Sequence, residues 1–162
     1  MLKITRFKSV KNTKPVEVST LSTIIEEIRQ NENPSKSPKK DKLPVFTPTG
    51  QFNYRSIAGL EEYNGVICLD IDNVEDVITL KARAEKLNYV HATFITPSGK
   101  GLKVVIKSKA TPETYKQVEM EIAEAFSHDT GGIRDNHCKD IARIQFVSYD
   151  PTAYINENSR IF

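Results

Sequence analysis

Residues 66–72 read VICLDID, and this stretch decides how the fold is interpreted. In an extended strand side chains alternate between two faces, so Asp70 and Asp72 share one face with Cys68. The opposite face is apolar throughout and suits a core: Ile67, Leu69 and Ile71. Two neighbouring carboxylates repel each other unless a cation lies beside them, either a divalent metal or a lysine or arginine side chain. The stretch therefore predicts a strand that ends in a charged site.

The composition is that of an ordinary globular domain. The 162 residues are 38% hydrophobic and 27% charged with a net charge of +2, which predicts one domain with a sizeable core. This near balance argues against a general nucleic-acid coat but permits a local basic patch. No apolar run reaches the length of a membrane span, and the N-terminus lacks a signal-peptide centre. Cys68 and Cys138 make neither a disulfide framework nor a zinc cluster, so we expect a cytoplasmic location.

Residues 1–60 are expected to form an N-terminal α/β extension. A strand is predicted over 2–8 and a helix over 23–30, begun by a capping box at Thr23. Residues 31–42 contain two prolines and four lysines but no apolar residue, which indicates a mobile basic loop. These lysines are either simply solvated or in contact with a phosphate backbone.

Residues 61–162 show the clearer pattern. Their apolar periodicities predict six elements in the order strand 66–72, helix 74–87, strand 90–96, strand 102–107, helix 112–126 and strand 142–148. The order β-α-β-β-α-β is that of a ferredoxin-like, RRM-like core of the α+β class. In this topology the first strand lies between the third and fourth and antiparallel to both. Both helices cover one face of the sheet and leave the other open.

This topology brings acids and bases to one end of the open face. If Val104 faces the helices, alternation places Lys103 on the open face, and the same argument applies to Arg143 on the last strand. Both cations are then expected beside Asp70 and Asp72. The two aspartates would face a basic cluster rather than the core.

The D-x-D pattern alone has several interpretations. It begins haloacid-dehalogenase-like phosphatases and occurs in many glycosyltransferases, and it is also an ordinary strand end in which Asp72 or Asn73 caps helix 74–87. The phosphatase fold needs its D-x-D on a parallel sheet. The tight connection PSGKG at 97–101 instead predicts antiparallel strands, so the phosphatase interpretation is the weaker one.

The stretch TPSGKGLK at 96–103 suggests a phosphate site. It is not a P-loop, because that motif has four residues between its glycines and a Ser or Thr after its lysine. A plain hairpin turn is the alternative. Backbone N–H groups in a glycine-rich turn, flanked by Ser98, Lys100 and Lys103, are able to cradle an anion.

Three motifs stand in order: VICLDID, SGKGLK at 98–103 and IRDNHCKDIAR at 133–143. Together they resemble the catalytic core of archaeo-eukaryotic-type primases and primase-polymerases. The resemblance is closer to the VirE N-terminal domain family of bacterial mobile-element proteins and spans residues 36 to 162. It includes further stretches that recur together in that family: K-x-x-L-P from Lys40 to Pro44, G-x-F from Gly50 to Phe52, and F-x-S-Y-D-P from Phe146 to Pro151.

The resemblance implies a metal site. By position, Asp70, Asp72 and Asp135 would hold two divalent ions, Mg²⁺ or Mn²⁺, for attack of a 3′-hydroxyl on an α-phosphate. In the predicted topology Asp135 precedes the last strand and so lies near the other two acids. Considered alone, Asp135 is equally well a solvated loop acid.

The resemblance also implies a nucleotide site. Ser98 and the turn residues Gly99, Lys100 and Gly101 would contact a nucleoside triphosphate, with Arg143 neutralising its charge. Lys103 replaces the histidine of the primase pattern. Lysine binds phosphate as a point charge but does not reproduce imidazole geometry. The replacement of histidine by Lys103 therefore argues against full polymerase activity.

The sequence thus predicts a metal-dependent, nucleotide-binding, primase-polymerase-like domain acting in mobile-element DNA replication, a nucleotidyltransferase if the chemistry survives Lys103. Its partners would be a nucleoside triphosphate and single-stranded or primed nucleic acid, with no membrane. The chain ends at NENSRIF without an obvious stop signal, and we expect a longer protein with a C-terminal helicase-like or VirE-type domain. The alternative is a catalytically inactive nucleic-acid-binding module that retains the same fold.

Overall fold

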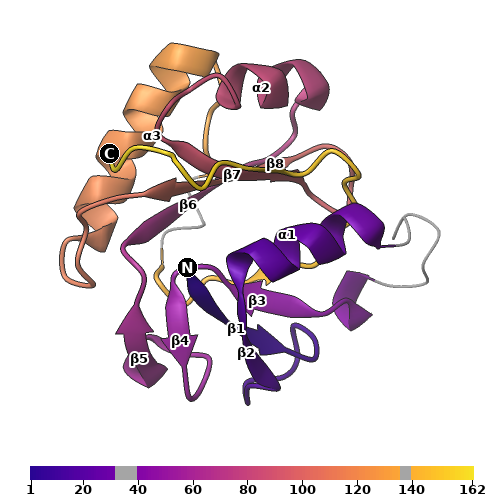
Figure 1. Cartoon of the computed structure of the whole chain (residues 1–162), viewed down its shortest axis with the longest axis vertical. Coiled ribbons are helices and arrows are strands. Elements are labelled where there is room, and N and C mark those ends of the chain that lie inside the picture. The colour runs from indigo at the N-terminus through magenta and orange to yellow at the C-terminus, as the bar shows by residue number, and fades with distance from the viewer. Residues whose placement is uncertain (32–39, 136–139) are drawn as a thin grey trace.

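The computed structural model describes residues 1–31, 40–135 and 140–162, and this part of the chain has an α+β structure. Two antiparallel sheets of four strands lie in layers, with helices on both sides of the second sheet (Figure 1). The first sheet has the order β2-β1-β3-β9: β2 (Glu17–Thr20), β1 (Lys3–Phe7), β3 (Val45–Thr47) and β9 (Gln145–Phe146). The second has the order β10-β7-β8-β6: β10 (Tyr154–Ile155), β7 (Val90–Ile95), β8 (Leu102–Lys107) and β6 (Val66–Ile71). A separate hairpin pairs β4 (Gly50–Phe52) with β5 (Leu60–Tyr63).

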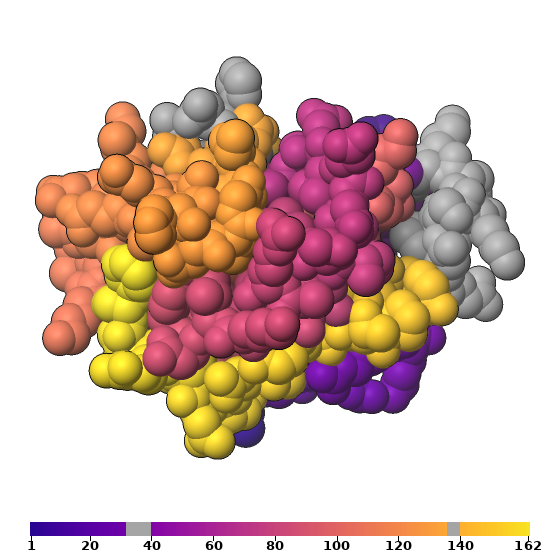
Figure 2. Space-filling view, turned by 90° about the horizontal axis from the view of Figure 1, so that it is seen from above, coloured from indigo at the N-terminus to yellow at the C-terminus, as the bar shows by residue number. Residues whose placement is uncertain are grey.

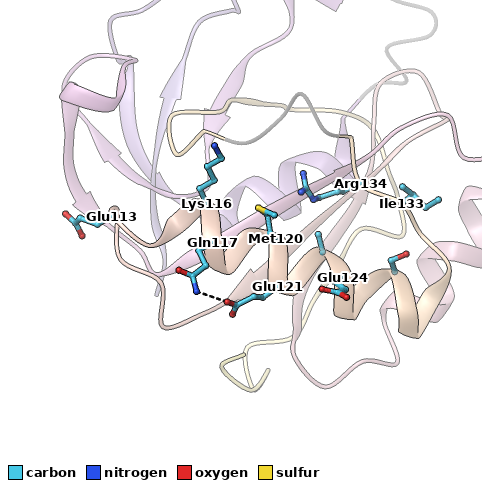
Figure 3. Close-up of a pocket in the computed structure, with 10 residues that line it drawn as sticks. Glu113, Lys116, Gln117, Met120, Glu121, Glu124, Ile133 and Arg134 are labelled. Carbon is cyan, nitrogen blue, oxygen red and sulfur yellow. Dashed lines mark hydrogen bonds between the residues drawn. The ribbon is translucent and has the colours of Figure 1, made fainter.

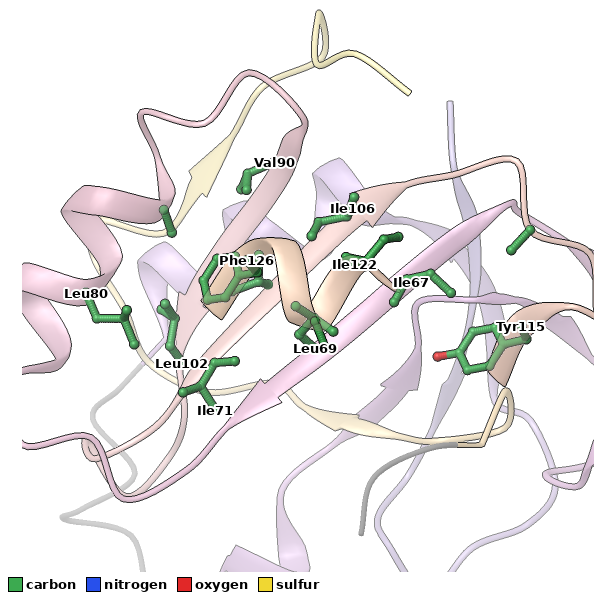
Figure 4. Close-up of a cluster of buried hydrophobic side chains, with 14 of the residues drawn as sticks. Ile67, Leu69, Ile71, Leu80, Val90, Leu102, Ile106, Tyr115, Ile122 and Phe126 are labelled. Carbon is green, nitrogen blue, oxygen red and sulfur yellow. The ribbon is translucent and has the colours of Figure 1, made fainter. Parts of the chain in front are cut away.

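Two helices cover one face of the second sheet. These are α2 (Val77–Ala84) and α3 (Tyr115–Thr130). Alternate residues of β6 and β8 point toward them and form a core with Leu80, Ile122 and Phe126 (Figure 4). The sheet contributes Ile67, Leu69, Ile71, Leu102, Val104 and Ile106, which are at most 2% exposed. The apolar face of 66–72 is therefore the helix-covered face that its alternation predicts.

The opposite face of the second sheet is not open, and that expectation was wrong. Helix α1 (Leu21–Gln30) and the first sheet pack against it and form a second core. Ile24, Ile25 and Ile28 of α1 are fully buried there, together with Cys68 and Phe94 of the second sheet. This face of the sheet carries several apolar side chains, including Phe94 and Val105, and exposing them to water would be costly. The end of this face that bears Asp70 borders a cleft.

The predicted fourth strand is also corrected. Strands β6, β8 and β7 are neighbours in the antiparallel order expected for a ferredoxin-like core, but 142–148 does not pair with β6. Only Gln145–Phe146 is extended into a ladder, and it pairs with β3 in the first sheet. Local alternation predicts a strand without specifying its partner, and here the N-terminal sheet supplies the partner. Strand β6 is consequently an edge of its sheet, and β10 forms the other edge.

The helices begin elsewhere than predicted. Helix α1 is capped by Thr20, whose side chain accepts from the Thr23 N–H, and not by a box at Thr23. Helix α2 is capped by Asp76 rather than by Asp72 or Asn73, because Asn73 takes a left-handed conformation at φ 56°. Residues 32–39 of the predicted basic loop, and Cys138, lie outside the described residues. No helix in the described ranges is long and apolar enough to cross a membrane.

Candidate functional site

A buried ion pair joins the two central strands at the accessible end of the second sheet. Asp70 of β6 and Lys103 of β8 are directly opposite in the register, and the Lys103 ammonium pairs with the Asp70 carboxylate. Their side chains are 6% and 9% exposed. Phe94 of β7 lies opposite Lys103 on its other side. The prediction that Lys103 lies within reach of Asp70 or Asp72 is confirmed for Asp70, and this lysine is the cation that the Asp70 carboxylate requires.

Asp72 lies just beyond the strand and is exposed. The left-handed turn at Asn73 reverses the chain there, a conformation that asparagine tolerates better than most residues. The Val74 N–H then donates to the Lys100 carbonyl at 2.8 Å, which ties the end of β6 to the turn between β7 and β8. The Asp72 carboxylate is consequently held against that turn.

The turn between β7 and β8 is closed by its own hydrogen bonds. The Thr96 N–H donates to Gly101 O and the Gly99 N–H to Thr96 O, both at 2.9 Å, and Thr96 Oγ1 lies 3.1 Å from Ser98 Oγ. A Cβ on Gly101 would lie 2.9 Å from Asp72 Oδ1 and 2.8 Å from Thr96 Oγ1. Glycine is required at 101 because the Asp72 carboxylate and the Thr96 hydroxyl occupy the space of a side chain.

A cleft of about 290 Å³ lies here, and the ion pair, Asp72 and the start of the turn line it. Its charged lining is mixed: Asp70, Asp72, Lys40, Lys103 and Arg143. Apolar groups line the remainder, and the Lys40 ammonium lies 4.9 Å from the centroid of the Phe146 ring. The volume is at the lower end of the range for small-molecule sites. A compact ligand with both anionic and apolar parts would match this lining.

The structure brings together most of the predicted site residues. Asp70, Asp72, Ser98, Lys103 and Arg143 all line the cleft. The remaining turn residues, Gly99, Lys100 and Gly101, belong to the hairpin that carries Ser98 but are not part of the lining.

Asp135 is placed differently from the other two acids. Its backbone N–H donates to the Asp70 carbonyl at 2.7 Å, so the segment after α3 lies along the edge of β6. The residue is half-buried and does not line the cleft. In the described part of the chain, no three His, Cys, Asp or Glu side chains are grouped so that they could hold a metal ion. The three acids are therefore not gathered as a metal triad in this structure.

Six cleft residues were not predicted as site residues: Val10, Lys40, Thr96, Pro97, Ile144 and Phe146. Lys40 and Phe146 do belong to the stretches K-x-x-L-P and F-x-S-Y-D-P, and these stretches were the available signal. Val10 carries no such signal, because it reaches the cleft only through the packing of the N-terminal sheet.

A larger hollow of about 790 Å³ lies along α3, away from the ion pair. Met120 on the helix and Ile133 and Arg134 after it form part of its wall (Figure 3). Glu113, Lys116 and Glu121 on its lining are exposed. Arg134 on the same lining pairs with the buried Glu119 at 3.2 Å, so a desolvated ion pair borders both hollows. The smaller cleft differs because two carboxylates and three basic side chains from separate segments of the chain converge on it. We therefore place the candidate site in the cleft.

Comparison with known protein families matches residues 38–155, well over half of the chain, to the family described as BT4734-like, N-terminal domain. No curated protein and no solved structure matched the chain. The resemblance to the VirE N-terminal domain family and to primase cores is corrected by this match, which is to a different family and gives no link to primase-polymerases. The motifs behind that resemblance are short, and strand ends and hairpin turns favour the same residues. The chain belongs to the BT4734-like N-terminal domain family.

Proposed function

We propose that the cleft binds a nucleotide through its phosphate groups together with one divalent cation, and that its chemistry is nucleotidyl transfer. The observation that carries the proposal is the convergence of two carboxylates and three basic side chains on one small cleft, with the Asp70–Lys103 pair buried at its base. Buried charges are expensive to maintain, and they concentrate where proteins bind charged ligands. The proposal rests on this site and on no family relationship.

The phosphates would be bound by the basic side of the cleft. Arg143 presents a planar guanidinium that suits bidentate contacts to phosphate oxygens, and Lys103 acts as a point charge. Ser98 offers a hydroxyl from the glycine-rich turn. As a 3′-hydroxyl attacks the α-phosphate, its proton passes to solvent water, the bond to the leaving pyrophosphate breaks, and negative charge develops on the pyrophosphate. The Arg143 guanidinium and the Lys103 ammonium would stabilise that charge.

The metal ion, Mg²⁺ or Mn²⁺, would be bound mainly by Asp72. Mg²⁺ usually binds one or two carboxylates plus substrate phosphates and retains several waters, so it does not require a cage of protein ligands. Asp72 is exposed at the mouth of the cleft, and Asp70 lies behind it on the same face. One ion carried in with the nucleotide fits this donor set.

The apolar part of the cleft would contact the base or sugar. Phe146 is half-buried and lies beside Ile144 and Val10 in the lining. An aromatic ring provides a stacking surface that tolerates any base. The cleft is therefore expected to select the phosphate end of the ligand and to accept any base.

The second candidate function is a catalytically inactive module that binds nucleic acid. One observation favours it: Lys103 already neutralises Asp70, so the cleft has a stable charge arrangement without a metal ion. Such a module would bind phosphate backbone through Lys40 and Arg143 with no need for Mg²⁺.

Isothermal titration calorimetry separates the two functions. The titrants are ATP and a ten-nucleotide oligothymidine, each with and without Mg²⁺ or Mn²⁺. The proposed function predicts ATP binding that requires the metal and is lost in Arg143→Ala. Lys116→Ala on α3 serves as the charge-matched control and should bind normally. Metal-independent binding of the oligonucleotide alone would replace the first function with the second.

A further inference from the structure

The stretch FVSYDP at 146–151 holds the outer edge of β7 next to the turn of the candidate site. The Ser148 hydroxyl donates to the Ile95 carbonyl at 2.6 Å, and the Ile95 N–H donates to Asp150 Oδ2 at 3.1 Å. Both backbone groups of one residue are therefore bound by two side chains. This stretch was noted as a motif in the sequence, yet only Phe146 of it lines the cleft.

The position of Ile95 explains why side chains are needed. Strand β10 pairs with β7 only at Ala92 and Thr93, so it stops short of the end of β7. Beyond it the outer edge of β7 would expose unpaired backbone groups. Ser148 and Asp150 take the place of the absent strand at Ile95. The following residue, Thr96, begins the turn that carries Ser98.

Asp150 is itself fixed by a buried network. Its Oδ1 accepts from the Thr152 N–H at 2.9 Å and from the Thr152 hydroxyl at 2.8 Å. Its Oδ2 lies 3.3 Å from the Lys81 ammonium of α2, which also donates to Thr152. The side chains of Asp150 and Lys81 are 1% and 5% exposed. Figure 2 shows the C-terminal segment (yellow) lying along the segment that contains α2, so helix, sheet and C-terminal segment are joined here.

We propose that Ser148 and Asp150 are positioning residues for the candidate site: by fixing Ile95 they set the orientation of the Thr96–Gly101 turn and of Ser98 within it. The expected effect on ligand affinity rests on the proposed function. The expected effect on the Thr96–Gly101 turn does not depend on that function. On the outer edge of β7, the bonds at Ile95 directly precede the turn, so loosening Ile95 would move Thr96 and the hydroxyl of Ser98 that it contacts.

A purely structural role is distinguished by a matched pair of variants. Ser148→Ala removes a buried hydroxyl from the site end of β7. Ser159→Ala removes another buried hydroxyl from the opposite end, where Ser159 Oγ lies 3.1 Å from His91 Nδ1. Each variant loses one buried hydrogen bond to the same strand, so both should lower stability to a similar extent.

The test measures backbone amide hydrogen exchange at residues 96–101 and the dissociation constant of Mg²⁺·ATP. Ser148→Ala should speed exchange in the turn and weaken Mg²⁺·ATP about tenfold, as expected for a lost orienting hydrogen bond. Ser159→Ala should leave both unchanged. Equal effects of the two variants on the turn would overturn the inference. If the parent protein binds no nucleotide, the proposed function fails, and the exchange data alone still decide whether Ser148 holds the turn.

Discussion

Asp70 and Lys103 show how a single cross-strand pair defines a site. Their side chains lie side by side because the register places them opposite each other on the same face. Burial makes each charge depend on the other, since removing one leaves the other desolvated and uncompensated. The expected repulsion between Asp70 and Asp72 is relieved by this lysine, while Asp72 remains exposed at the mouth of the cleft.

Breaking this pair should be strongly destabilising. Lys103→Met leaves a buried Asp70 carboxylate, and we expect a loss of about 3–5 kcal/mol in the free energy of unfolding. Asp70→Leu combined with Lys103→Met replaces the pair with apolar groups and should recover most of that loss. Urea denaturation followed by circular dichroism measures the cycle. A double variant as unstable as the single one would show that the pair is not the source of the effect.

The buried imidazole of His91 should make the protein less stable in mild acid. Burial lowers the pKa of this imidazole below its ordinary value, and Nδ1 lies 2.8 Å from the Asn156 carbonyl. In the unfolded chain this imidazole takes up a proton at about pH 6.5, its ordinary value. Because burial lowers the pKa, the folded chain takes up the proton only at lower pH. The stability that comes from burying neutral His91 should be fully present above pH 6.5. Below pH 6.5 the free energy of unfolding should decrease by at most about 1.4 kcal/mol per pH unit.

Denaturation curves at a series of pH values between 5 and 7.5 measure this dependence. His128 is exposed, so His128→Asn should retain the slope, whereas His91→Gln should flatten it. An unchanged slope in His91→Gln would assign the acid sensitivity to other groups.

At the scale of elements, the turn between β7 and β8 connects the strands to the site. Gly101→Ala places a methyl group where Asp72 Oδ1 and Thr96 Oγ1 now lie, so the carboxylate must move. Gly99 has φ 72° and open space around it, so Gly99→Ala costs only backbone strain, about 1 kcal/mol.

These two substitutions therefore have different expected effects. Both should lower the free energy of unfolding, but only Gly101→Ala should also weaken Mg²⁺·ATP binding measured by calorimetry. If Gly99→Ala weakens binding as much as Gly101→Ala does, turn flexibility rather than the position of Asp72 controls affinity.

The sequence predicted elements well where the pattern is local. Alternation in 66–72 and 102–107 gave the correct faces, and the tight turn at 97–101 indicated the antiparallel pairing of β7 with β8. Stretch 142–148 failed because alternation carries no information about a distant partner. The start of α2 was misplaced because 72–76 offers three capping residues, and the backbone at Asn73 decided among them.

At the scale of the whole molecule, the cleft exists because two layers meet. The second sheet supplies Asp70 and Lys103, and the N-terminal part of the chain supplies Val10 and Lys40. The first group follows from the alternation of one strand pair. The second group does not follow from the sequence, because docking of one sheet on another depends on shape and not on a repeating pattern.

The same interlayer core predicts that residues 61–162 do not fold alone. Without α1 and the first sheet, this fragment exposes a face that includes Cys68, Phe94 and Val105. We expect the full chain to unfold in one cooperative transition and the fragment to bind the dye ANS without such a transition. A fragment that unfolds cooperatively would establish residues 61–162 as an independent domain.

The position of a bound metal nucleotide decides whether the cleft around Asp70 and Lys103 is the nucleotide site. Mn²⁺·ATP added to isotopically labelled protein broadens the amide signals of residues close to the ion. A nucleotide site in this cleft predicts that signals of residues 70–73 and 96–101 disappear first and that Asp72→Asn abolishes the effect. Broadening centred on the α3 hollow around residues 116–124, or broadening that persists unchanged in Asp72→Asn, would contradict a nucleotide site in this cleft.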